Sequence, residues 1–220
     1  MSKLFLWGAG GHAKVVLDIA RALNRFSGVE FIDENAGRAG EEFCGCRVLG
    51  SPEIACIGDG DFLVISIGSN QARARCAGIA RSRGWQLATL IHPSAVVSPS
   101  ARIGAGTVVM PRAVVNAGAE IGENSIINTG ALVEHDCRIG DHVHLSPGAI
   151  LGGAVRVESF AHMGLGSIAL PGSSIGGNAV VGAGAVVLRS VGHSQTVVGV
   201  PARPIRQQNR PGSCATGASR

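Results

Sequence analysis

The chain has 220 residues, enough for one large or two small domains, and it contains 33 glycines but only six Phe, two Trp and no Tyr. The net charge is +4 without a Lys/Arg-rich run, which argues against nucleic acid and suits an anionic small molecule. The opening MSKLFLWGAGGH turns glycine-rich after four apolar residues, so we expect neither a signal peptide nor membrane insertion. Six scattered cysteines form no zinc or redox pair, which indicates reduced thiols in a cytoplasmic protein.

Residues 1–92 form the first predicted domain, in which strands and helices alternate. The predicted elements are a buried strand over 3–7, a glycine loop over 8–14 with a helix to about 25, strands over 29–32 and 47–49, a buried run over 61–68, and a helix over 70–83. Ser69 or Asn70 caps the last helix. This alternation predicts a small Rossmann-like domain with a parallel sheet of three or four strands.

The glycine loop has the composition of a phosphate-binding turn. Gly8 and Gly10 let the backbone approach a phosphate, and the following helix start offers free N–H groups. The spacing fits G-x-G-x-x-A, and Asp33 follows at the distance of an acid that binds a ribose hydroxyl. Half of a dinucleotide fold can hold one nucleoside diphosphate. The alternative is a glycine turn required only for packing; Trp7 and Trp85 are predicted to be core residues.

His92 and Pro93 mark an extended entry into the second predicted domain, residues 93–206, and His92 is predicted to be structural. From Ala95 to Leu188 the sequence repeats every six residues without a slip. Sixteen consecutive apolar positions carry the repeat: Val97, Ile103, Val109, Val115, Ile121, Ile127, Val133, Ile139, Leu145, Leu151, Val157, Met163, Ala169, Ile175, Val181 and Val187. A period of this kind predicts a left-handed parallel β-helix with three hexads in each coil and five coils between the first and last of these positions.

Small residues two places earlier are expected at the tight corners, and the glycine that often follows each apolar residue is expected to adopt left-handed backbone angles. Cys137 belongs to the inward small-residue column and cannot reach a substrate. Residues 207–220 are predicted to be a disordered tail.

His135, in Glu134-His135-Asp136, follows the inward Val133 by two places and therefore projects outward. Stacking by eighteen residues places Ala117 below it and Gly153 above it, and flanking carboxylates can orient its ring and stabilise the protonated form. An outward imidazole in this setting predicts a general base.

Other histidines follow the same register. His144 and His162 differ by eighteen and are expected to stack in one column, whereas His142 is predicted to be solvated. A zinc site on these three is a weaker alternative. A second column, Asn128, Ser146, Gly164 and Gly182, predicts a smooth track for an extended pantetheine arm.

These motifs together make the chain similar to bacterial sugar acyltransferases that join a small nucleotide-binding domain to a left-handed β-helix. The family includes N-acetyltransferases of nucleotide-linked 4-amino-4,6-dideoxy sugars and of GDP-perosamine, and sialic acid O-acetyltransferases. The resemblance extends from residue 3 to about 206 and rests on GAGGHAK from residue 8, FIDE from 31, HPSA from 92, VEHDCRIG from 133 and VGVPAR from 198.

The resemblance implies a homotrimer with acetyl-CoA as cosubstrate, bound between subunits, and no metal. His135 would be the general base and Asp136, one methylene shorter than a Glu, would orient it. His144 would lie near the acetyl group or the acceptor across the subunit boundary. The implied coenzyme site comprises His144, Gly153, Leu165, Gly182, Ala183, Pro201 and Arg203, and the implied acceptor site comprises Gly8, Gly10, Gly11, His12, Asp33, Glu34, Asn35 and Glu134. Asn35 stands where a basic residue would help to bind phosphate.

The sequence therefore predicts an acetyl-CoA-dependent N-acetyltransferase of a nucleotide-activated 4-amino-4,6-dideoxy sugar, UDP-linked or of the GDP-perosamine type, in polysaccharide biosynthesis. O-acetylation of sialic acid or a related sugar is the alternative. A non-catalytic trimeric nucleotide-binding scaffold is a more distant one.

Overall fold

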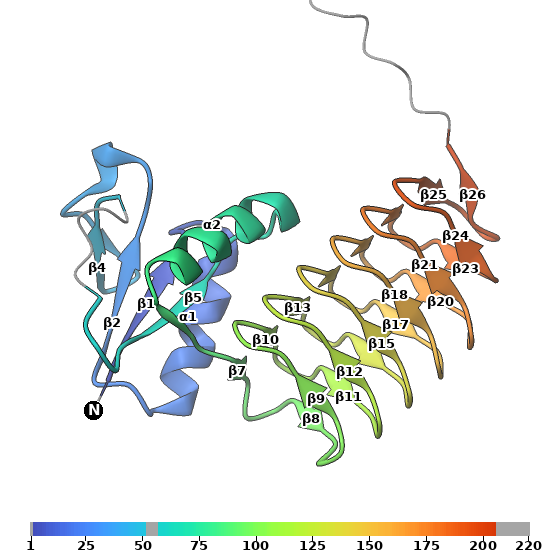
Figure 1. The fold of residues 1–220 in the computed structure, drawn as a ribbon, viewed down its shortest axis with the longest axis horizontal. Helices are drawn as coiled ribbons and strands as arrows, with labels where there is room; N and C mark the ends of the chain where they lie inside the picture. Colours follow the sequence, from blue (N-terminus) through green and yellow to red (C-terminus); the bar gives the residue numbers. More distant parts are fainter. Residues whose placement is uncertain (1, 52–56, 206–220) are drawn as a thin grey trace, which may run out of the picture.

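The computed structural model describes residues 2–51 and 57–205 and shows a small α/β domain joined to a long triangular prism of stacked coils (Figure 1). The predicted tail, 207–220, lies outside the described residues, as does the end of the second predicted domain at 206.

The N-terminal sheet has six strands, in the order β3-β4-β2-β1-β5-β6, so the prediction of three or four strands was wrong. Parallel strands are β1 (Lys3–Trp7), β2 (Gly28–Ile32), β4 (Cys46–Leu49), β5 (Phe62–Ile65) and β6 (Gln86–Leu87), and β3 (Glu42–Phe43) pairs antiparallel with β4. The two strands that were missed, β3 and β6, are two-residue edge strands, too short to show a pattern of alternation.

Helices α1 (Gly11–Leu23) and α2 (Asn70–Ser82) cover opposite faces of this sheet. Successive side chains of a strand point to opposite faces. Accordingly, Leu4 and Leu6 of β1 pack with α1, whereas Phe5 and Trp7 pack with α2. Trp7 is buried edge-to-face against Trp85, as predicted for core residues.

Three sheets form the prism, which we call faces I, II and III in chain order. Face I contains β7 (Leu90–Ile91), β10 (Val108–Val109), β13 (Ile126–Ile127), β16 (His144–Leu145), β19 (His162–Met163), β22 (Val180–Val181), β25 (Thr196–Val198) and β26 (Arg203–Pro204). Face II contains β8 (Val96–Val97), β11 (Val114–Val115), β14 (Leu132–Val133), β17 (Ile150–Leu151), β20 (Ile168–Ala169) and β23 (Val186–Val187). Face III contains β9 (Arg102–Ile103), β12 (Glu120–Ile121), β15 (Arg138–Ile139), β18 (Arg156–Val157), β21 (Ser174–Ile175) and β24 (Ser190–Val191).

The predicted register of eighteen residues is confirmed from Val97, which pairs with Val115, up to Val187, which pairs with Ala169. Beyond this point the step shortens to sixteen, because Ile175 pairs with Val191. The second residue of each two-residue strand points inward, and together these residues form the continuous core of the prism. Cys137 lies fully buried in that core, as predicted. Its thiol donates a hydrogen bond to the carbonyl of Gly152.

The expectation of left-handed glycines after each inward residue was wrong. Left-handed backbone occurs instead at the third residue after the inward one, for example at Asn124, Asp136 and His142. Gly104 and its equivalents are needed for close approach: a Cβ on Gly104 would lie 2.6 Å from the backbone carbon of Gly122 in the next coil. The corner residue is therefore free to carry a functional side chain.

The N-terminal domain packs on the first coils of face I. Outward residues of this face, Leu90, Val108 and Ile126, are buried in one cluster with α1 and β1. The prism then extends away from the domain towards its C-terminal coils (Figure 1). Within the described residues, no helix combines the length and apolar character required to cross a membrane.

Candidate active site

The glycine loop opens into a cavity of about 380 Å³ between β1 and α1. Its lining is Trp7, Gly8, Ala9, Gly10, Gly11, His12, Asp33, Glu34, Ser66, Ile67 and Gly68. Gly8 has φ +109°, which glycine tolerates best, whereas no atom lies within 4 Å of where a Cβ would stand on Gly10 or Gly11. Helix α1 begins beside this space without a side-chain cap and with no acid in its first turn, so its end is suited to an anion.

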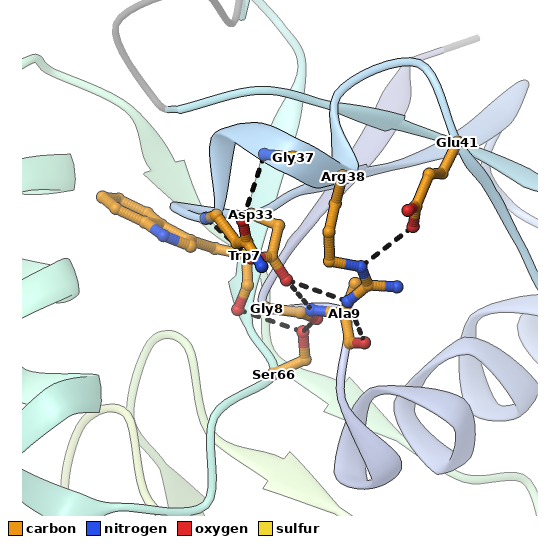
Figure 2. Close-up of polar contacts among 9 residues, drawn as sticks. Trp7, Gly8, Ala9, Asp33, Gly37, Arg38, Glu41 and Ser66 are labelled. Carbon is orange, nitrogen blue, oxygen red and sulfur yellow. Dashed lines mark hydrogen bonds and ion pairs between the residues drawn. The ribbon is translucent and has the colours of Figure 1, made fainter.

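Asp33 is largely committed to holding the loop together (Figure 2). Its Oδ2 accepts hydrogen bonds from the Ala9 N–H at 3.1 Å and from Arg38 Nη1 at 3.2 Å, and its Oδ1 accepts the Asn35 N–H at 3.0 Å. Arg38 also donates to the carbonyl of Ala9 at 2.7 Å and pairs with Glu41 at 3.1 Å. Arg38 was not predicted, although it is the first basic residue after β2 and could have been tested as a partner of Asp33.

The acids and amides beside Asp33 have local roles in this structure. Asn35 caps the 3₁₀ turn η1 (Ala36–Arg38) by accepting the Gly37 N–H, and Glu34 forms a half-exposed ion pair with Arg75 at 3.4 Å. Only Glu34 of these lines the cavity.

Three imidazoles meet where the glycine loop faces the prism. The His12 and His144 rings are 6.4 Å apart, and the predicted stack of His144 on His162 is confirmed at 4.8 Å with an interplanar angle of 2°. Burial, together with neighbouring positive groups, lowers the pKa of His12 to about 4 and that of His144 to about 3. Both rings are therefore neutral near pH 7.

Hydrogen bonds hold the stacked rings in place. Asn128 Nδ2 lies 3.1 Å from His144 Nε2, and Ser146 Oγ lies 2.8 Å from His162 Nε2. The first two residues of the predicted smooth column, Asn128 and Ser146, thus carry side chains that orient imidazoles. At Gly164, the third residue of the column, a Cβ would lie 2.6 Å from the carbonyl oxygen of Val181.

His142 was wrongly predicted to be solvated. It is half-buried at the edge between faces III and I, 3.1 Å from Asn124 Nδ2, with its ring 5.0 Å from that of Phe160. It was missed because the N-terminal domain, far away in sequence, covers this edge. Among the described residues, no group of three His, Cys, Asp or Glu side chains is arranged to hold a metal ion.

His135 lies at the edge between faces II and III, with its side chain 61% exposed. Its Nδ1 is 2.9 Å from Asp136 Oδ2, and this hydrogen bond, with the charges of Asp136 and Glu134, raises the pKa of His135. Glu134 accepts the backbone N–H of His135 at 3.3 Å. The arrangement leaves Nε2, the ring nitrogen that is not bonded to Asp136, to accept a proton on an oriented and more basic imidazole, as a general base requires.

Gly153 lies directly against this imidazole. A Cβ built on Gly153 would be 2.6 Å from His135 Nε2 and 2.7 Å from Cε1. On the other side, a Cβ on Gly118 would be 2.7 Å from Asp136 Oδ1. Residues without side chains above and below the pair therefore determine where the ring and the carboxylate lie.

The remaining residues predicted for the coenzyme lie in the C-terminal coils. Leu165 is 59% exposed, and Gly182 packs closely on Val198. Ala183 follows at the corner, and Pro201 and Arg203 are exposed at the end of the prism, where Arg203 lines a cavity of about 360 Å³.

Within one chain, the glycine-loop cavity and His135 lie on opposite sides of the prism. His12 faces His144 on face I, whereas His135 stands on the edge between faces II and III, which is the edge opposite face I in a triangular prism. The inward residues of the core fill the space between them. The structure thus brings together the predicted loop residues with His144, and separately His135 with Asp136 and Gly153.

Comparisons with known proteins cover both halves of the chain. Residues 3–79 match the PglD N-terminal domain, and residues 100–134 and 118–153 match the bacterial transferase hexapeptide (six repeats). A search of curated proteins gave no match.

Three solved structures are similar over nearly the whole chain. The acetyltransferase domain of PglB from Neisseria gonorrhoeae is 37% identical, with 93% of this chain and 100% of that chain covered and a TM-score of 0.89. PerB from Caulobacter crescentus, solved with CoA and GDP-perosamine, is 39% identical, with 94% and 98% covered and a TM-score of 0.85. WeeI from Acinetobacter baumannii is 30% identical, with 93% and 100% covered and a TM-score of 0.87.

The fold, the exposed His–Asp pair and these similarities define the class of protein. The chain belongs to the family of sugar acyltransferases that carry a left-handed β-helix. Within this family it is a nucleotide-sugar acetyltransferase.

Proposed function

We propose that the protein transfers an acetyl group from acetyl-CoA to the amine of a nucleotide-activated 4-amino-4,6-dideoxy sugar, with His135 as general base. The observation that carries the proposal is the His135–Asp136 pair, exposed on the prism and joined at 2.9 Å. The similarity to PerB, solved with CoA and GDP-perosamine, supports both substrates.

In this mechanism the neutral amine attacks the thioester carbonyl, and a C–N bond forms as the C–S bond breaks. Nε2 of His135 accepts the amine proton and passes it to the leaving thiolate, while Asp136 holds the Nδ1–H side of the ring. A positioned base contributes about 10²–10⁴-fold, and binding both substrates in one groove contributes much of the remainder. Cys137 takes no part, because it is buried in the core.

We place the reaction between subunits of a trimer, because one chain holds its acceptor cavity and its base on opposite sides. The outward residues of face II support self-association: the column is entirely apolar and consists of Val96, Val114, Leu132, Ile150, Ile168 and Val186. His135 stands at the edge of this face. Ile150→Glu should convert a trimer into monomers in sedimentation and abolish turnover, whereas an active Ile150→Glu monomer would refute the shared site.

The coenzyme is proposed to lie in the groove between two prisms. It would pass Gly153, on the edge between faces II and III of one prism, and Leu165, Gly182 and Ala183, on the edge between faces I and II of the other, towards Pro201 and Arg203. Leu165 and Ala183 are exposed along this path, and the guanidinium of Arg203, exposed at the end of the prism, suits the phosphates of CoA.

The acceptor is proposed to bind in the glycine-loop cavity, with its diphosphate at Gly8, Gly10 and Gly11. His12 lines the cavity, and its buried Nε2 has no hydrogen-bond partner among the described residues. Because the structure commits Asp33 to Ala9, Asn35 and Arg38, contacts to the base and ribose fall more to Glu34 than to Asp33.

A thiol-release assay tests the proposal. Purified protein is given acetyl-CoA with GDP-, UDP- and CMP-linked sugars, each as the amine and as the matched hydroxyl compound. We expect CoA release with a nucleotide-linked amino sugar and a mass increase of one acetyl group on its amine. Release only with hydroxyl sugars would indicate O-acetylation, and nucleotide binding without CoA binding would indicate a scaffold; either result overturns the proposal.

A further inference from the structure

Helix α2 lies along the prism edge between faces III and I and contacts three successive coils. The contacted residues are the corner positions Asn124, His142 and Phe160, which are spaced by eighteen residues and have left-handed backbone at each position. Asn70, the first residue of α2, donates to the carbonyls of Phe160 at 2.9 Å and Ala161 at 3.1 Å. The repeat that builds the prism therefore also spaces the acceptors to which the N-terminal domain binds.

Arg73 is the central residue of this contact and is only 1% exposed. Towards the prism, Nε donates to the carbonyl of Asn124 at 2.7 Å, and Nη2 donates to those of His142 at 2.9 Å and Val143 at 3.3 Å. Asn124 reciprocates, with Nδ2 donating to the carbonyl of Arg73 at 3.2 Å.

Towards its own domain, Arg73 holds the loop after β5. Nη1 donates to the carbonyls of Ile67 at 3.2 Å and Gly68 at 3.1 Å, and Nη2 donates to Asn70 Oδ1 at 2.9 Å. Ile67 and Gly68 line the glycine-loop cavity, and Gly68 also lines a second cavity together with His144 of face I. One guanidinium thus joins a wall of the acceptor cavity to the coils that carry His142 and His144.

No carboxylate pairs with this guanidinium within the described residues, and its partners are all oxygen atoms of neutral groups. A buried cation without a counter-charge is costly, and apolar residues would join two surfaces at lower cost. The fixed fork of donors offers geometric precision that an apolar contact does not.

The charge also acts on the imidazoles around it. Arg73 contributes to the lowered pKa of His12, His142, His144 and His162, after burial in each case. Besides one another, the charged groups around these rings are Asp33 and Glu34 across the cavity and Asp141, Glu123 and Arg81 near His142.

We propose that Arg73 is a positioning residue, which fixes the acceptor cavity of the N-terminal domain against face I and so sets where the acceptor amine lies. This proposal takes the identity of the acceptor from the proposed function, whereas the position of the cavity comes from the contacts of Arg73 alone.

Arg73→Met and Arg73→Lys test this role, with Arg81→Met as the matched control. Arg81 lies on the same helix and pairs with Glu123 of the prism at 2.8 Å, but its side chain is 68% exposed, so its loss should change every measurement less than twofold. We expect Arg73→Met to lower kcat/KM for the amino sugar about a hundredfold while KM for acetyl-CoA stays within twofold. Arg73→Lys keeps the charge but lacks the fork, so it should recover only part of the loss.

NMR titration of the histidines provides a readout that needs no turnover. Arg73→Met should raise the pKa of His144 by about half a pH unit or more, because the nearby positive charge that disfavours the protonated ring is lost. A lowered melting temperature with unchanged kcat/KM and unchanged histidine titration would show a purely structural residue and overturn the inference. If the wild-type protein acetylates no sugar, the proposed function fails, and an unchanged His144 titration would then still overturn this inference by itself.

Discussion

Gly153→Ala is the substitution for which the structure makes the sharpest prediction. The added Cβ would stand 2.6 Å from Nε2 of His135, whereas ordinary contact begins at 3.4 Å. The ring must therefore move by at least 0.8 Å, the difference between these two distances. The imidazole is the exposed end of a side chain, so it can swing away at little cost to stability, but it then leaves the line of the Asp136 hydrogen bond.

A displacement of about 1 Å at a catalytic group costs on the order of 10²-fold in rate. We therefore expect kcat to fall 10- to 100-fold while the melting temperature stays within about two degrees and KM for acetyl-CoA rises little. Initial rates by thiol release, with melting curves, measure all three quantities. Gly78→Ala is the matched control, since Gly78 is exposed on α2 with open space around it and should tolerate a methyl group. A raised KM for acetyl-CoA with normal kcat would refute the reasoning, because the methyl group would then obstruct the coenzyme without displacing His135.

Three further predictions follow from the charges and contacts of the site. Since Asp136 raises the pKa of His135 and the base must be neutral, Asp136→Asn should move the acid limb of kcat/KM to lower pH; an unmoved limb would exclude the pairing. His144 is neutral in the folded protein near pH 7, because its pKa is about 3 when folded against 6.5 when unfolded. The free energy of unfolding that this difference contributes is therefore fully present above pH 6.5 and falls by about 2 kcal/mol by pH 5; a urea midpoint equal at pH 7.5 and pH 5 would contradict this. Arg38→Ala frees Ala9 and Asp33, and should raise KM for the nucleotide sugar about tenfold without changing KM for acetyl-CoA; equal effects on both would point to unfolding.

The prism could be predicted from sequence in detail because its register is local. Each inward residue is fixed by a count of six, so the count alone assigns Cys137 to the core and His135 to the surface. The stacked pair of His144 and His162 follows from the same count.

Contacts between the two domains could not be predicted in this way. His142 and Arg73 are 69 residues apart, and no periodicity relates a helix of the first domain to a corner of the second. The left-handed positions were also misplaced, because glycine occurs at two different places of the repeat for two different reasons. One place has positive φ, and the other has backbone from the next coil where a Cβ would stand.

The catalytic role of His135 is the claim on which the account depends most, and one measurement tests it directly. His135→Ala removes the base while leaving the exposed edge and the groove intact, so acetyl-CoA should bind with unchanged affinity by calorimetry. At saturating acetyl-CoA and amino sugar, we predict that turnover falls by about 10²–10⁴-fold. Turnover within a few-fold of the wild type would contradict the assignment of His135 as the base.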